Sequence, residues 1–348
     1  MKTLLVFILL SAFLVGCSKK SGKPPSTTAA WPFQPTVVET PQQQEINDIQ
    51  NKATTLLAAK DFARLDAFAK QLRDSKEQDA SGVWKLGCLY DGLSTKHEAT
   101  DVEWTNRLAA LNSWAKAVPH SLTAQVALAN GLVDYAWFIR GHDFAQKVKA
   151  ESWEPFFQRL NDALSILKKA RTLKEKCPVW WHTLLRAELG LQMARVDYDA
   201  VFNEAIKEWP DYAGFYFARA NYLLPRWSGA EGEVETDLEK SADKRPGDAG
   251  DMLYAQVVWN MHHTSFSTNL LFEYHFSWDR LNRGLNAIEQ HYPDSLAVKN
   301  EAAHLALLAH DCQAAKEYFD QTQGQIDTSV WSSNNYVQFA QYVYGRPQ

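Results

Sequence analysis

The chain has 348 residues, of which 46% are hydrophobic, and it contains only 16 glycines and 13 prolines. This composition supports a sizeable core and excludes the collagen-like and the mostly disordered classes of protein. The formal net charge of -5 provides no strongly basic surface, so no nucleic-acid partner is expected.

The first predicted element is an N-terminal signal segment. Lys2 precedes an apolar run, Leu4 to Val15, which is too short to cross a bilayer as a stable helix. A cleavable signal peptide is therefore predicted over residues 1–16. The four residues LVGC, from Leu14 to Cys17, resemble the lipobox of bacterial lipoproteins.

This resemblance implies that Cys17 becomes the lipidated N-terminus and that its acyl chains hold the protein on a bilayer. Ser18 after the cysteine implies an outer-membrane destination facing the periplasm. Residues 17–41 are rich in Ser, Thr, Lys, Pro and Gln, which predicts a flexible tether. The aromatic residues Trp31 and Phe33 interrupt it, and they are expected either to dock on the body as a clip or to bind a partner.

Residues 42–348 are predicted to form one helical-repeat domain. Apolar residues recur at helical spacing in successive segments, and no alternating run is bounded by hairpin turn residues, so no strands are expected. The predicted helices cover residues 46–57, 63–72, 83–93, 102–118, 122–139, 153–173, 179–193, 198–209, 212–224, 234–242, 252–262, 278–291, 297–310, 312–322 and 331–344.

The stretch from Tyr198 to Leu224 shows the repeating unit most clearly. Pro210 separates two amphipathic helices, which predicts a helical hairpin that must stack on its neighbours. Proline turns recur at Pro119, Pro178, Pro210, Pro246 and Pro293, at intervals of 59, 32, 36 and 47 residues. Two of these intervals lie near the period of about 34 residues in tetratricopeptide repeats, and the longer ones leave room for insertions. The predicted fold is all-α, an irregular tetratricopeptide-like α-solenoid of stacked helical hairpins.

Three cysteines remain once Cys17 is lipidated, namely Cys88, Cys177 and Cys312. An odd number in an oxidising compartment leaves at least one thiol unpaired or intermolecular. Their spacing matches no metal-binding motif. Cys88 and Cys312 lie inside helical patterns, where the role of a small buried apolar residue is expected.

The most unusual local sequence is LPRWSG, at Leu224 to Gly229. Arg226 and Trp227 are the candidate partner-binding residues, because a planar guanidinium and a large indole suit an interface. Alternatively, Trp227 packs against the next helical pair and Arg226 binds helix carbonyls. Together with YAQVVW and the later WDRL and YPDS segments, this stretch resembles the uncharacterised domain-of-unknown-function family 4034. That resemblance implies a helical-repeat fold and no established activity.

Candidate metal ligands by residue type are His262, His263 and His275, with Glu273 nearby. Their spacing is irregular and no HExxH motif is present, which favours surface or loop histidines. Glu301 and His304 share one helix face, at the ExxH spacing, but a dinuclear carboxylate site needs a second such motif. No metal or other cofactor is expected.

Aromatic pairs could instead line a groove for a glycan or a peptide. Trp180-Trp181 and Trp137-Phe138 are adjacent in the sequence, so one ring of each pair could point away from the core, although burial on both faces is the alternative.

The sequence thus favours a membrane-anchored periplasmic lipoprotein that acts as a non-enzymatic protein-binding scaffold for an envelope protein. The alternatives are an envelope enzyme or a glycan- or peptide-binding protein, using the loop from His262 to His275 or an aromatic groove.

Overall fold

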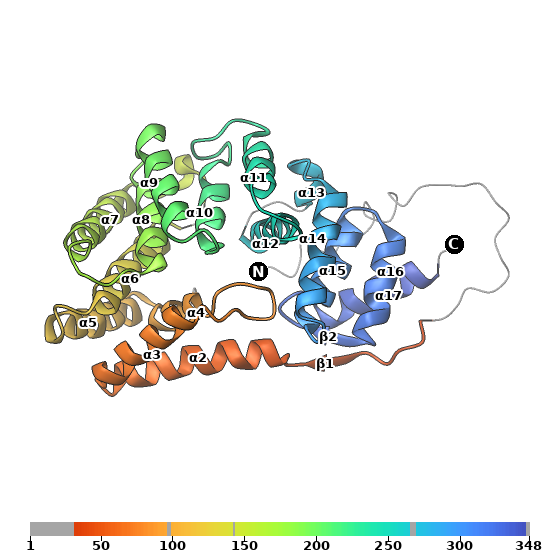
Figure 1. The fold of residues 1–348 in the computed structure, drawn as a ribbon, viewed down its shortest axis with the longest axis horizontal. Coiled ribbons are helices and arrows are strands. Elements are labelled where there is room, and N and C mark those ends of the chain that lie inside the picture. The colour runs from red at the N-terminus through yellow and green to blue at the C-terminus, as the bar shows by residue number, and fades with distance from the viewer. Residues whose placement is uncertain (1–30, 96–98, 142, 265–268, 346–348) are drawn as a thin grey trace. The chain divides into compact units, whose positions relative to one another are not determined.

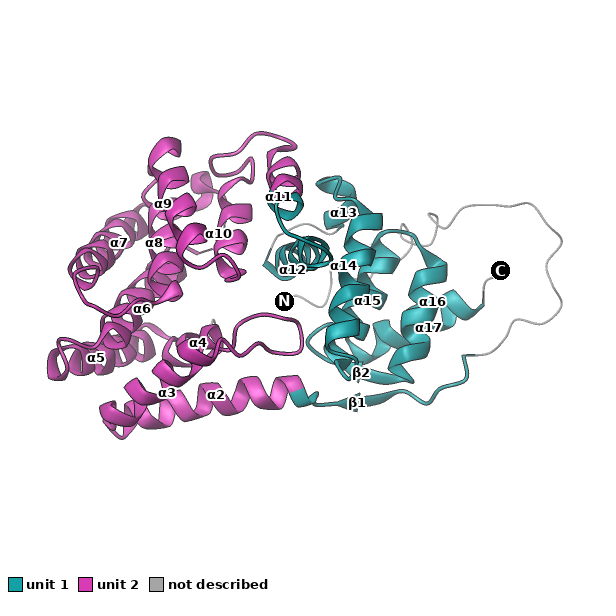
Figure 2. Ribbon diagram, in the orientation of Figure 1, with its two compact units in different colours: residues 1–41, 241–348 teal, residues 42–240 magenta. Residues whose placement is uncertain are grey.

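The computed structural model describes residues 31–345 except 96–98, 142 and 265–268 (Figure 1). The described chain is largely helical, so the predicted all-α helical-repeat fold is confirmed. It contains two compact units (Figure 2): unit 2 is residues 42–240, and unit 1 is the described part of residues 1–41 and 241–348. Among the described residues, no helix is both long enough and apolar enough to span a bilayer.

Unit 2 consists of successive helices joined by short turns. Its elements are α2 (Pro41–Ala58), α3 (Phe62–Ser75), α4 (Leu86–Leu93), α5 (Asp101–Ala117), α6 (Leu122–Arg140), the 3-10 turn η1 (Ala145–Lys147), α7 (Ala150–Ala170), α8 (Pro178–Gly190), α9 (Arg195–Glu208), α10 (Gly214–Tyr222) and α11 (Glu233–Asp243). The first residue of α2 and the last residues of α11 belong to unit 1.

Local signals in the sequence explain where these helices begin. Thr100 and Glu103 form a reciprocal capping box at the start of α5. The Ser121 hydroxyl accepts the Ala124 N–H at the start of α6, and Pro178 occupies the first position of α8. Helix α6 packs on α5, α7 and α8, so each helical pair buries its apolar side against its neighbours.

Unit 1 combines helices with one very small sheet. Its elements are β1 (Thr36–Val38), α12 (Ala249–Thr264), α13 (Leu270–Glu273), α14 (Trp278–His291), α15 (Leu296–Leu308), α16 (Cys312–Thr322), β2 (Gln325–Asp327) and α17 (Ser333–Tyr344). Helix α14 packs on α12, and α16 packs on α15. Side chains of Ser277, Ser295 and Asp311 cap the N-termini of α14, α15 and α16.

The expectation that the chain lacks strands is wrong for two short segments. β1 and β2 pair in parallel, with Val37 opposite Ile326. Each strand has three residues, which is too short to show alternation, and its partner lies at the other end of the sequence. Sequence patterning therefore carries no signal for this pairing.

Strand β1 belongs to a segment, residues 31–38, that we call the strap. Its Trp31 ring meets Tyr336 of α17 edge to face at a centroid distance of 5.7 Å, and the Thr36 N–H donates to the Gly324 carbonyl. The strap is thus the aromatic clip docked on the body, although its residues were expected to belong to the flexible tether over 17–41. The predicted signal peptide and Cys17 lie outside the described residues.

Candidate ligand-binding pocket

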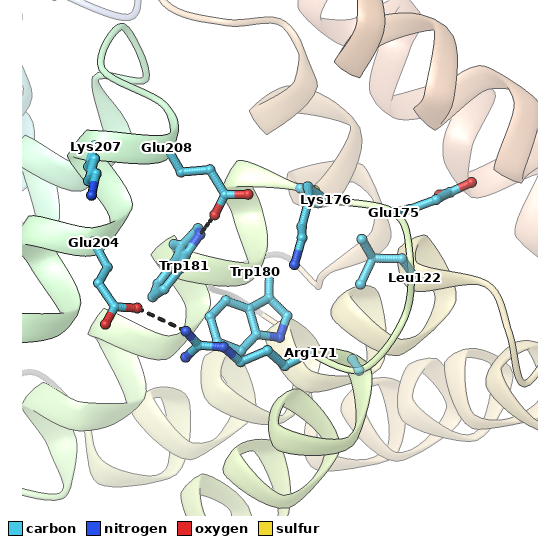
Figure 3. A pocket seen from close by; sticks show the side chains of 11 residues that line it. Leu122, Arg171, Glu175, Lys176, Trp180, Trp181, Glu204, Lys207 and Glu208 are labelled. Carbon is cyan, nitrogen blue, oxygen red and sulfur yellow. Dashed lines mark hydrogen bonds and ion pairs between the residues drawn. The ribbon is translucent and has the colours of Figure 1, made fainter.

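A cavity of about 340 Å³ lies in unit 2, at the junction of α7, α8 and α9 (Figure 3). Its volume is within the range of small-ligand sites. The end of α7, the following loop, the first turn of α8 and the last turns of α9 supply most of its wall. The lining residues are Leu122, Ala170, Arg171, Glu175, Lys176, Cys177, Trp180, Trp181, Glu204, Lys207 and Glu208.

Two perpendicular indoles form the aromatic part of this wall. Because Pro178 begins α8, Trp180 and Trp181 fall in its first turn, with ring centroids 4.7 Å apart. The Trp180 N–H donates to the Leu167 carbonyl at 2.9 Å, and the Trp181 N–H donates to Glu208 at 2.8 Å. Each of these residues is 6% exposed, so the expected burial of the pair agrees with the structure, while both rings still contact the cavity.

Arg171, at the end of α7, lies over both indoles (Figure 3). Its guanidinium carbon is 5.4 Å from the Trp180 ring centroid and 5.0 Å from the Trp181 ring centroid. Its Nη2 donates to the Glu204 carboxylate at 2.8 Å. The arrangement combines a cation–π contact with an ion pair, and both side chains of that pair are more than half exposed.

The rest of the wall is polar and balanced in charge. Glu175, Glu204 and Glu208 supply three carboxylates, and the wall also contains three cationic side chains. Glu175 accepts a hydrogen bond from Arg73, a buried guanidinium, at 2.9 Å. Such a wall suits binding through charge and aromatic contact. Cys177 is a buried free thiol and Cys88 is free as well, which agrees with the expectation that at least one thiol is unpaired. Cys312 is disulfide-bonded, so the buried apolar role expected for it is wrong.

Arg226 and Trp227, the predicted partner-binding residues, lie elsewhere in unit 2. The Trp227 ring meets Trp137 of α6 edge to face at 5.4 Å, and the Arg140 guanidinium lies 5.0 Å from the Trp227 centroid. Arg226 donates to Asn221 at 3.3 Å. Trp227 therefore packs inside the helical body, as the packing interpretation has it, but against the earlier helix α6 and not against the next helical pair. Contact with a partner stays a prediction.

The predicted metal candidates are only partly brought together. Helix α12 continues through Thr264, so His262 and His263 lie on a helix and not in the expected loop. His262 Nε2 is 3.3 Å from His304 Nδ1, and His263 Nε2 is 3.0 Å from Glu301 on α15. His275 is exposed, and within the described residues no group of three or more His, Cys, Asp or Glu side chains could hold a metal ion.

The electrostatics of this histidine cluster follow from burial. Burial, with a smaller effect of the neighbouring histidines, lowers the pKa of His304 to about 3. Burial opposes the charged form of His263, but the hydrogen bond and the charge of Glu301 outweigh it and raise the pKa of His263. The Glu301 side chain is fully buried, and the contact with His263 provides a hydrogen-bond partner for one of its carboxyl oxygens.

Sequence reasoning did not identify the polar cluster that joins α6 and α8. Asp134 accepts hydrogen bonds from Arg186 at 2.6 Å, from Asn130 at 2.9 Å and from Ser94 at 2.6 Å. The spacing of Asn130 and Asp134 places both on one face of α6, which is the only signal in the sequence. Sequence reasoning also did not identify three pocket residues, Arg171, Glu204 and Glu208. Their contacts arise from packing between helices, for which the local sequence contains no pattern.

Comparison with protein-family models and with curated proteins found no match. The resemblance to domain-of-unknown-function family 4034 therefore stays a prediction, and the geometry of the pocket carries the functional argument.

Proposed function

We propose that this chain is a lipid-anchored, non-enzymatic binding protein of a bacterial cell envelope, in which the helical repeats of unit 2 hold a segment of a polypeptide partner. The anchor is supported by the sequence of residues 1–17, in which an apolar run ends at the lipobox-like Leu14 to Cys17. Fatty-acid labelling and membrane fractionation test the lipid anchor. Cys17→Ala should abolish both the incorporation of the fatty acid and the recovery of the protein in the membrane fraction.

The observation that carries the binding role is the indole-lined pocket. A cavity of about 340 Å³ with two buried indoles and six charged side chains offers both an apolar contact area and polar groups that fix orientation. A side chain from an extended partner fits this volume, whereas the neighbouring helix surfaces can contact the rest of the segment. Aromatic residues with charged neighbours are typical of interface hot spots.

Crosslinking and affinity capture from intact cells test this role. Lys207→Trp places an indole at the pocket wall from an exposed position on α9. Asn203→Trp is the matched control, since Asn203 is exposed on the same helix one turn earlier and does not line the pocket. We expect the wild type and the control to capture the same partner and Lys207→Trp to lose it at unchanged melting temperature. Equal capture by all three proteins would move the interface away from this pocket.

A further inference from the structure

We infer that the pocket accepts a basic side chain of the partner polypeptide, preferably an arginine guanidinium, and that Arg171 occupies the position of this group in the unbound protein. The inference rests on the proposed function of the pocket and names the chemical class that it binds. It is carried by three features of the wall, namely the contacts of Arg171, the charge that remains without it, and the exposure of its ion pair.

The contacts of Arg171 are those that a guanidinium ligand would make. Its guanidinium carbon lies 5.0 and 5.4 Å from two indole centroids, and its Nη2 lies 2.8 Å from the Glu204 carboxylate. A planar, delocalised cation gains from stacking on aromatic rings and from a carboxylate that accepts its N–H groups. The two indoles are perpendicular, so one cation contacts both rings.

The charge balance of the wall favours a single positive charge. The Glu175 carboxylate keeps its ion pair with Arg73 when the Arg171 guanidinium swings out. Glu204 then loses its cationic partner, and a monocationic side chain restores that pair. An acidic side chain would instead be repelled by the Glu204 carboxylate.

Arg171 can leave its position at low cost. Its side chain is 53% exposed and that of Glu204 is 59% exposed, and an ion pair of this kind contributes little to stability. Both partners remain accessible to water when they separate, so no buried charge is left without compensation. Its departure would also uncover the indoles, because the guanidinium lies over both of them.

Arginine suits the pocket better than lysine. Glu204 and Glu208 are one turn apart on α9 and therefore face the same side of the helix. A guanidinium presents several N–H groups in one plane, so it can stack on an indole while it donates to a carboxylate. An ammonium group is a more strongly hydrated point charge and lacks the stacking surface.

The test removes the internal competitor from the full chain. Arg171→Gln and the wild type are titrated with N-acetyl-arginine amide, and binding is followed by tryptophan fluorescence and calorimetry. We expect the variant to bind about 5- to 30-fold more tightly, because the ligand no longer competes with one exposed ion pair and one cation–π contact. N-acetyl-citrulline amide, which has nearly the same shape without the charge, should bind to neither protein.

A double variant separates this mechanism from an indirect change in the pocket. Arg171→Gln/Glu204→Gln removes the proposed carboxylate, so the gain in affinity should disappear. Both substituted side chains are exposed, and circular dichroism and the melting temperature check that the fold is retained. The inference would be overturned if Arg171→Gln bound N-acetyl-arginine amide no more tightly than the wild type does. It would also be overturned if N-acetyl-citrulline amide bound as tightly as N-acetyl-arginine amide. Pocket-dependent capture of a partner in cells would still support the proposed function in that case.

Discussion

At the scale of single residues, Glu188 on α8 shows how the helical packing of unit 2 disfavours a charge. The residue is 6% exposed, and its Oε2 has no hydrogen-bond partner among the described residues. Burial, with a smaller effect from Asp197, raises the pKa of Glu188 to about 7. The carboxyl group is therefore largely protonated in the folded protein at a pH where it is ionised in the unfolded chain.

We expect Glu188→Gln to stabilise the protein at pH 8 and to leave its stability almost unchanged at pH 4. A raised pKa stabilises the fold fully below the unfolded value of about 4.5, and this contribution is lost as pH rises towards 7. The neutral amide does not lose it, so the gain at pH 8 is on the order of 3 kcal/mol. Urea denaturation at both pH values measures the difference, and exposed Glu154→Gln is the control. An equal effect of Glu188→Gln at both pH values would contradict the assignment.

At the scale of elements, the strap depends on a glycine at the start of β2. Gly324 has a φ of +82°, a backbone conformation that residues other than glycine rarely adopt. A Cβ at this position would lie 2.5 Å from the Gln34 carbonyl oxygen and 3.1 Å from the Phe33 Cβ. The backbone of the strap is thus packed directly against the turn that precedes β2.

Gly324→Ala should therefore release the strap and destabilise unit 1. Backbone strain and the clash together are expected to cost about 1–3 kcal/mol. Gly247→Ala is the matched control in the same unit, since Gly247 has a φ of +59° but open space around its Cβ position. Limited proteolysis should cut Gly324→Ala near residues 31–38 faster than either the wild type or the control. Equal cleavage of the two variants within residues 31–38 would contradict a specific role of Gly324 in holding the strap.

Local sequence patterns predicted most helices because each helix carries its own apolar face and boundary residues. Ser121 and Pro178 mark the starts of α6 and α8 in the sequence as they do in the structure. The same logic failed for β1 and β2, whose pairing joins distant segments. Local patterns also failed at His263, because a polar helix end shows no more periodicity than a loop.

The candidate pocket was predictable only in its aromatic half. Trp180 and Trp181 stand out in the sequence because they are adjacent. Arg171 and Glu204 are ordinary surface residues by local pattern, and their ion pair arises from the packing of α7 and α9 beside α8. Packing between helical pairs depends on the shape of many side chains together, so no single spacing encodes it.

At the scale of the whole molecule, the strap and the pocket belong to different compact units. Unit 2 contains Trp180 and Trp181, whereas the strap, which lies within the predicted lipid tether, is held by β2 and α17 of unit 1. Each unit has its own buried leucines, such as Leu185 on α8 and Leu285 on α14, both 0% exposed. A substitution that destabilises the core of unit 2 should therefore affect the pocket first, and one that destabilises the core of unit 1 should affect the strap first.

We expect Leu185→Ala to lower the local stability of unit 2 by about 2–5 kcal/mol, because a buried leucine side chain is replaced by a cavity. In helical repeats stability is largely a sum over neighbouring elements, so the loss should be confined. Hydrogen exchange should accelerate in residues 42–240 and remain unchanged in residues 241–345. Leu285→Ala should produce the reverse pattern, with loss of protection in unit 1. Equal acceleration of both units by either variant would mean that they unfold as one cooperative body, and a strap variant would then weaken the pocket as well.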